Sequence, residues 1–83
     1  MNSETYVGVD VSKKLLDVNV LPVNQAQQFA NDDKGVKHLV KFLCKIDPTL
    51  IVFESTGGFE MLAVSSLIEH HMPVVIINPR QVR

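Results

Sequence analysis

Residues 51–58, IVFESTGG, contain the step from strand to helix that decides the fold. Residues 49–54, TLIVFE, carry an unbroken apolar run, which is typical of a β-strand covered on both faces. The strand ends at Glu54, and a carboxylate is costly to remove from water. We therefore expect Glu54 either to reach solvent at the strand tip or to meet a positive charge. Gly57 and Gly58 then allow a tight turn into a helix.

Alternating segments precede this strand. In TYVGVDVS, residues 5–12, valines at every second position fall on one face and Asp10 falls on the other. LLDVNVLP, residues 15–22, alternates in the same way. The short lysine pair at 13–14 between the two segments predicts an antiparallel hairpin. A third strand is expected at AQQFAN, residues 26–31.

The next segment changes to a helical period. NDDKGVKHLVKFLCKIDP, residues 31–48, repeats apolar residues at helical spacing. Asn31 or Asp32 is expected to cap its start, and Pro48 to close its end. Cys44 falls near the apolar stripe, where a small core residue is expected. The lysines fall on the other side, a pattern that more often marks a solvated helix face than a DNA-binding patch.

A second helix is predicted in STGGFEMLAVSSLIEHH, residues 55–71, with Ser55 or Thr56 as its cap. Its apolar residues form two stripes and cover almost the whole circumference, and such a helix normally has neighbours on both sides. We therefore expect another chain or a further segment to cover it, and predict a homo-oligomer formed through residues 59–68. The last strand is predicted in MPVVIINP, residues 72–79.

The resulting order, β-β-β-α-β-α-β, combines a three-stranded meander with two crossover helices. Right-handed crossovers limit how such a sheet is wound, and the compact solution has strand order 3-2-1-4-5. This is an α/β, ribonuclease H-like mixed sheet with helices between strands 3 and 4 and between strands 4 and 5. Because the closing residues RQVR form no cap or turn, we expect residues 1–83 to be a piece of a larger domain.

In this topology the first and fourth strands are parallel neighbours about 4.8 Å apart. Asp10 and Glu54 then lie near each other at the carboxyl edge of the sheet, where α/β proteins bind ligands. Two carboxylates so placed repel each other unless one is protonated or a cation lies between them. Mg²⁺, or Mn²⁺, suits such oxygen ligands. The alternative is that both acids are ordinary solvent-exposed groups at strand ends.

Composition limits the function classes. The chain of 83 residues has 46% hydrophobic and 20% charged residues, as in soluble globular domains. With a formal net charge of −1, the chain lacks the excess of basic residues that is typical of an autonomous nucleic-acid binder. Cys44 is the sole cysteine, which excludes an intrachain disulfide and fits a reducing cytosol. No signal peptide is visible, and the apolar runs are too short to span a bilayer.

Four segments together carry a family resemblance: YVGVDVSKKLLDVNVL, FANDDKGVKHLVKFL, IVFESTGGFEMLAVSSL and PVVIINPRQVR. They resemble the N-terminal part of the DEDD-type transposases of bacterial insertion sequences and of the related Piv-type DNA invertases, which carry a RuvC-like domain. GVDVSK alone is a weak motif. Followed in order by ESTG and by NP after the next strand, it is specific, and the resemblance covers essentially the whole chain.

The resemblance implies functional roles. Asp10 matches the first acid of the DEDD set and Glu54 the second, while the third and fourth acids lie beyond residue 83, as does a further domain with a serine nucleophile. The implied parent is a bacterial, cytoplasmic, nucleoid-associated recombinase that cuts and rejoins DNA, guided in part of the family by an RNA. Residues 1–83 alone are expected to be inactive.

Other polar residues near this edge are weaker candidates. Ser12 and Lys13, at the hairpin turn beside Asp10, and Arg80, after the last strand, are candidates for phosphate contact. His70 and His71 are adjacent in sequence, so a regular helix points them about 100° apart and they cannot share one ion. Their expected role is to complement the dipole at the helix end.

The residues are also compatible with two other classes of function. Sugar kinases and actin-like ATPases also begin with a hairpin carrying GxD, but they use a Gly- and Thr-rich turn where this chain has Ser12, Lys13 and Lys14. A non-catalytic module that dimerises through the second helix is the third class. The substitution Asp10→Asn separates these readings, since it removes a metal ligand and leaves dimerisation intact.

Overall fold

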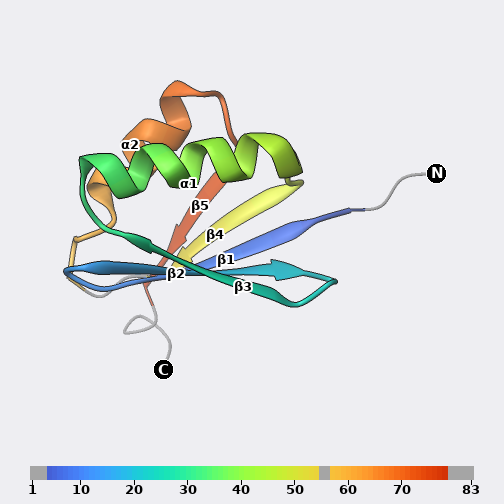
Figure 1. The fold of residues 1–83 in the computed structure, drawn as a ribbon, viewed down its shortest axis with the longest axis horizontal. Helices are drawn as coiled ribbons and strands as arrows, with labels where there is room; N and C mark the ends of the chain where they lie inside the picture. Colours follow the sequence, from blue (N-terminus) through green and yellow to red (C-terminus); the bar gives the residue numbers. More distant parts are fainter. Residues whose placement is uncertain (1–3, 55–56, 79–83) are drawn as a thin grey trace.

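The computed structural model describes residues 4–54 and 57–78. Its elements follow in the order β1 (Tyr6–Val11), β2 (Leu15–Leu21), β3 (Gln25–Ala30), α1 (Asp33–Ile46), β4 (Leu50–Glu54), α2 (Met61–Glu69) and β5 (Val74–Ile77). The strands form a five-stranded sheet in the order β3-β2-β1-β4-β5 (Figure 1). The predicted α/β class, strand order and helix positions are therefore confirmed.

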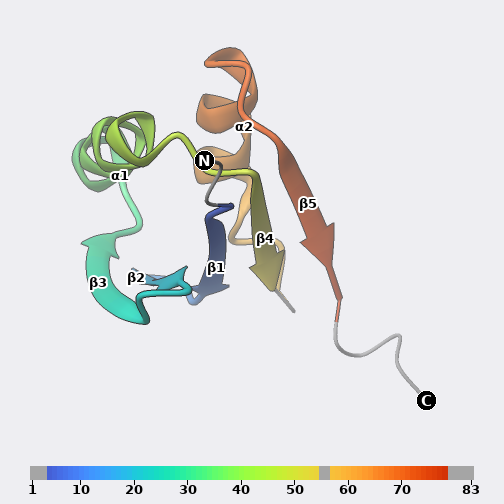
Figure 2. The same ribbon diagram turned by 90° about the vertical axis from the view of Figure 1, so that its right-hand side faces the viewer.

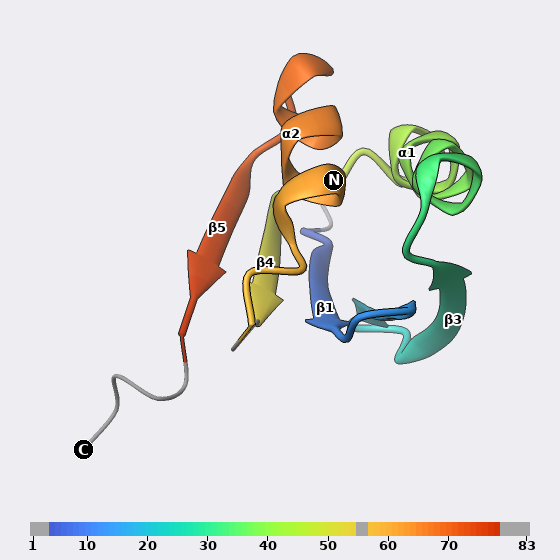
Figure 3. The same ribbon diagram turned by 90° about the vertical axis from the view of Figure 1, so that its left-hand side faces the viewer.

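Both helices lie on the same face of this sheet (Figures 2 and 3). The strands β1, β2 and β3 pair antiparallel in succession, whereas β1, β4 and β5 are parallel. As a result β3, β4 and β5 all run in one direction, and α1 and α2 are both crossover helices. The two crossovers advance across the sheet in the same direction. Right-handed connections made in one direction place their helices on one face.

The core fills the space between this face and the helices. Alternate residues of the strands point into it, and the buried cluster consists of Val7, Val9, Leu16, Val18, Val20, Val36, Leu39, Val40, Leu43, Ile51, Phe53, Ala63, Val64 and Leu67. The prediction that β4 is covered on both faces is wrong for the described residues. Ile51 and Phe53 are buried, but Val52 is only half-buried and Glu54 is exposed. The face opposite the helices is open in this part of the chain.

Helix α1 begins and ends as its sequence predicts. Asp32 is the N-cap, and its Oδ1 accepts a hydrogen bond of 2.7 Å from the backbone N–H of Gly35. Gly35 packs so closely on the end of β3 that an added Cβ would lie 1.9 Å from the carbonyl oxygen of Ala30. The expectation for Cys44 is wrong: its thiol side chain is exposed, because it lies on the flank of the helix beside the buried stripe.

Helix α2 is shorter than predicted, starting at Met61, and the cap candidates Ser55 and Thr56 lie outside the described residues. A turn over residues 57–60 precedes it. The helix buries Ala63, Val64 and Leu67. The other apolar residues of the predicted segment, Phe59, Met61, Leu62 and Ile68, are exposed. No helix in the described ranges is long and apolar enough to cross a membrane.

Candidate active site at the carboxyl ends of β1 and β4

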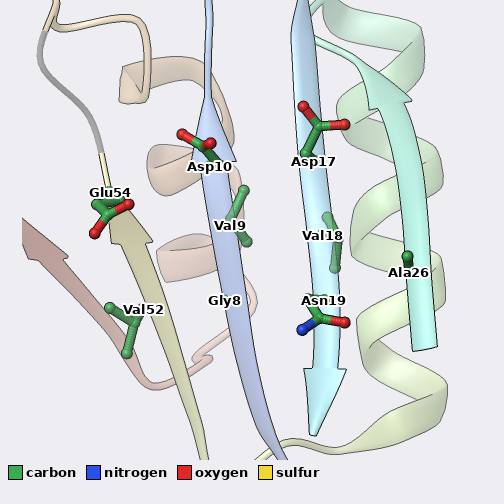
Figure 4. A pocket seen from close by; sticks show the side chains of 9 residues that line it. All are labelled: Gly8, Val9, Asp10, Asp17, Val18, Asn19, Ala26, Val52 and Glu54. Atoms are coloured by element: carbon green, nitrogen blue, oxygen red, sulfur yellow. The ribbon is translucent and has the colours of Figure 1, made fainter. Parts of the chain in front are cut away.

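The two predicted acids lie directly opposite each other. The register of the parallel pair β1–β4 places the Cα of Asp10 beside the Cα of Glu54. Both side chains are exposed and project from the sheet on the side away from the helices (Figure 4). This arrangement agrees with the topology expected from the sequence. Their role as metal ligands stays a prediction.

A third carboxylate lies in line with these two acids, which together form the acid row. It was not among the site residues predicted from the sequence. Asp17 on β2 is the register partner of Asp10 in the antiparallel pair, and Figure 4 shows it on the same side of the sheet. Its Oδ1 accepts a 2.7 Å hydrogen bond from Nε2 of Gln28, its partner on β3. Alternation along β2 already put Asp17 on the polar face, but only the hairpin register shows that it lies opposite Asp10.

A hollow lies beside the acid row on the open face. It has a volume of about 400 Å³, and its lining includes all three acids together with Gly8, Asn19, Ala26 and Val52. Gly8 borders open space, because a Cβ added there would meet nothing within 4 Å. The absence of a side chain at Gly8 and the short one at Ala26 therefore leave room next to Asp10 and Glu54 (Figure 4).

The carboxylates of the site are suitable ligands for a hard divalent cation, but they are few. Carboxylate oxygens are the ligands that Mg²⁺ prefers, and this ion keeps several waters in a protein site. Asp10 and Glu54 supply such oxygens from rigid neighbouring strands. The described ranges contain no group of three or more His, Cys, Asp or Glu side chains placed to hold one ion. Asp17 therefore does not complete a three-ligand set, and the described residues offer two ligands.

Asn31 connects the segments that flank both acids. Its Nδ2 donates to the carbonyl oxygen of Ser12 at 2.9 Å and to that of Phe59 at 3.0 Å. Its backbone N–H donates to the carbonyl oxygen of Lys14 at 2.9 Å. Asn31 thereby links the turn after Asp10 to the turn that precedes α2. The sequence predicts Asn31 as a possible helix cap, but the N-cap is Asp32.

The nucleic-acid contact candidates are only partly described. The Ser12 hydroxyl and the backbone of Leu15 are hydrogen-bonded at 3.2 Å, which closes the β1–β2 turn. Lys13 is exposed at this turn, next to the acid row. Arg80 lies outside the described residues. The turn lysine is thus available for contact, and Ser12 has a local structural role.

The start of α2 is a poor anion site. Its N-cap residue is Glu60, whose side chain makes no capping hydrogen bond. Oε1 of Glu60 is buried and has no hydrogen-bond partner within the described ranges. A carboxylate at a helix N-terminus already complements the positive end of the dipole. We therefore assign no phosphate site to this terminus.

The histidines lie past the helix rather than on it. His70 is the C-cap of α2, with Nδ1 2.8 Å from the carbonyl oxygen of Ser66, and His71 has a left-handed φ of 60°. A ring nitrogen that contacts a carbonyl oxygen at a helix end is its donor. This agrees with the expected role of complementing the dipole.

Comparison with known proteins decides the family. A family model described as a transposase, that of the IS110-type DEDD transposases, matches residues 7–83. The chain belongs to this DEDD transposase family. Its similarity to the pilin gene-inverting proteins of Moraxella lacunata and Moraxella bovis agrees with that membership: each is 28% identical to it, over 93% of this chain and 26% of the relative.

The fold of this transposase-family chain is also that of RuvC. The structure of T. thermophilus RuvC in complex with a Holliday junction substrate superimposes with a TM-score of 0.69, at 14% identity, over 96% of this chain and 68% of RuvC. An identity this low shows the fold alone. The predicted RuvC-like, ribonuclease H-like architecture is confirmed, and the chain spans 26% of the length of its curated relatives.

Proposed function

We propose that this chain is part of a DNA transposase or recombinase in which Asp10 and Glu54 hold a divalent cation, Mg²⁺ or Mn²⁺, at the site of DNA cutting and rejoining. The register that puts these two acids side by side on the open face carries the proposal. Family membership and the RuvC-like fold support it. We further propose that residues 1–83 are the N-terminal part of a RuvC-like domain, consistent with the 68% of the RuvC chain that they cover.

The protein's own contribution follows from the geometry. A bound divalent ion would polarise a phosphodiester and neutralise the charge that develops on it. Asp10 and Glu54 lie on paired strands, so their spacing is set by the sheet rather than by a loop. The hollow beside Gly8 leaves room for a phosphate or sugar next to them. Two acids are too few to organise a cutting site, so we expect no cleavage by residues 1–83 alone.

A metal titration tests the proposal. Mg²⁺ or Mn²⁺ should shift or broaden backbone NMR signals centred on Asp10 and Glu54, with a dissociation constant of about 1 mM or weaker because few protein ligands are present. Both Asp10→Asn and Glu54→Gln should abolish the effect. The matched control is Glu69→Gln, which removes an exposed acid of α2, on the helix side of the sheet, and should leave the effect intact.

Two results would contradict the metal site. One is a localised effect that persists in both Asp10→Asn and Glu54→Gln. The other is no localised effect in the wild-type chain at metal concentrations far above that dissociation constant, with all variants folded.

The remaining partners belong to the same proposal. DNA is the expected substrate of the whole protein, a guide RNA is its partner if this member follows the RNA-guided part of the family, and the bacterial cytoplasm near the nucleoid is its expected location. We also propose self-association through residues 59–68, where Met61 and Ile68 are each 58% exposed. Such self-association is also what a non-catalytic dimerising module would show. The family match gives no support to the alternative of a sugar kinase or actin-like ATPase.

A further inference from the structure

The lysines of the described residues gather in places that the acid row does not share. Asp10, Asp17 and Glu54 lie on the open face, away from the helices (Figure 4). The lysines of the described ranges lie in two places only, the turn at 13–14 and helix α1, which carries Lys34, Lys37, Lys41 and Lys45. Helix α1 thus carries four lysines on the opposite side from the acid row, with aspartates at both caps and in its first turn.

Part of this basic helix borders a groove. The groove has a volume of about 520 Å³ between α1 and α2, and its lining includes Lys37, Lys41, Ser66, Glu69 and His70. Lys37 and Lys41 are one helical turn apart, so they project side by side. Both lysines are exposed, and within the described ranges neither has an ion-pair partner. Glu69 is the one acid in the lining, so lysines outnumber it.

A second feature concerns the wall formed by α2. His70 contacts the carbonyl oxygen of Ser66 through Nδ1. That bond orients the imidazole at the helix end and leaves Nε2 as its other polar atom. The groove thus has two lysines on the α1 wall, the polar side chains of Ser66, Glu69 and His70 on the α2 wall, and the apolar Val40 between them. The paired lysines give the α1 wall the charge that complements an anionic phosphate chain.

We propose that this groove, with Lys37 and Lys41 as its charged contacts, binds the phosphodiester backbone of a nucleic-acid segment other than the one at Asp10 and Glu54. The contact is with phosphates and independent of sequence, because lysines bind phosphates as point charges and the lining offers no set of groups for reading base edges. The sheet separates the two surfaces, so a strand in the groove is not the strand at the acid row. DNA and RNA present the same backbone chemistry to it.

Salt-dependent binding tests this inference. Fluorescence anisotropy with labelled single-stranded DNA, duplex DNA and RNA of one sequence would be measured at several salt concentrations, with EDTA present throughout. Each lysine that neutralises a phosphate contributes about one unit to the slope of log affinity against log salt. The double variant Lys37→Gln with Lys41→Gln should lower that slope by about two units, and lower affinity about tenfold or more at low salt. Comparing the three probes identifies which nucleic acid the groove prefers.

The control is Lys45→Gln, which removes the same charge from the same helix outside the groove lining. It should change the slope by clearly less than either groove substitution. The inference is overturned if the wild-type chain binds none of the probes at low salt, or if Lys45→Gln weakens binding as much as Lys37→Gln. It is also overturned if Asp10→Asn weakens binding in EDTA, since binding would then depend on the acid row. Because EDTA removes divalent ions, failure of the metal site and failure of the groove are distinguishable.

Discussion

At the scale of single residues, Asn31 has more structural connections than its sequence context indicates. One amide nitrogen donates to carbonyl oxygens of two turns, at Ser12 and at Phe59. A typical hydrogen bond contributes about 0.5–1.5 kcal/mol net. We therefore expect Asn31→Ala to lower the free energy of unfolding by about 1–2 kcal/mol, measured by urea denaturation. Amide exchange should accelerate in both turns together.

The matched variant is Asn31→Asp, which keeps the shape and loses the two donors. An ionised carboxylate cannot donate to either carbonyl oxygen, so this variant should be at least as destabilised as Asn31→Ala. If Asn31→Asp were as stable as the wild type, the two hydrogen bonds would not hold the turns together.

At the scale of elements, the junction between β3 and α1 depends on close packing. A Cβ at position 35 would lie 1.9 Å from the backbone oxygen of Ala30, and backbone cannot move aside as a flexible side chain does. Overpacking of this kind costs about 1–3 kcal/mol. We expect Gly35→Ala to destabilise the chain by about 2 kcal/mol, although alanine favours helix by about 1 kcal/mol over glycine. Thermal or urea unfolding measures the loss.

Gly8→Ala provides the comparison. A Cβ at position 8 meets nothing within 4 Å, and alanine in a strand restricts the unfolded chain more than glycine does. The free energy of unfolding of Gly8→Ala should be equal to that of the wild type or higher by up to about 1 kcal/mol. Equal stability of Gly35→Ala and Gly8→Ala would show that the β3–α1 junction relaxes without cost.

At the scale of the whole molecule, the described chain leaves a large apolar surface in solvent. Exposure is 45% for Phe59, 58% for Met61 and 58% for Ile68, and the edge strand β5 adds Val75, Ile76 and Ile77 at 43–45%. Exposed apolar side chains that gather on two neighbouring elements are typical of interaction sites. If residues 59–68 mediate self-association, Ile68→Lys should shift the sedimentation profile toward monomer and leave the fold intact, because the side chain is mostly outside the core.

The control for this prediction is Val23→Lys. Val23, in the β2–β3 turn, is 70% exposed, so its replacement also exchanges an exposed apolar side chain for a charge, away from α2. It should leave the association unchanged. A wild-type chain that is monomeric at all concentrations tested, or equal effects of the two variants, would argue against residues 59–68 as the interface.

Local patterns in the sequence determined the elements of this protein. Period-two alternation specified β1 and β2 and the faces of Asp10 and Asp17, helical spacing specified α1, and its cap was narrowed to Asn31 or Asp32. These properties depend on neighbours a few residues apart, which is why the sequence predicts them. Handedness rules then limited the sheet to one compact order, so Asp10 and Glu54 were expected at the same edge.

Tertiary structure decided what depends on residues far apart in the chain. The register of β1 with β4 and with β2 aligned Glu54, Asp10 and Asp17 in one row, and no local pattern encodes a register between distant strands. Two crossovers in one direction put both helices on one face, so the apolar run of β4 is covered on one side only in the described residues. The same geometry placed the exposed Lys37 and Lys41 along a groove that α2 also lines, since the path of α2 is set by packing against α1 and β5.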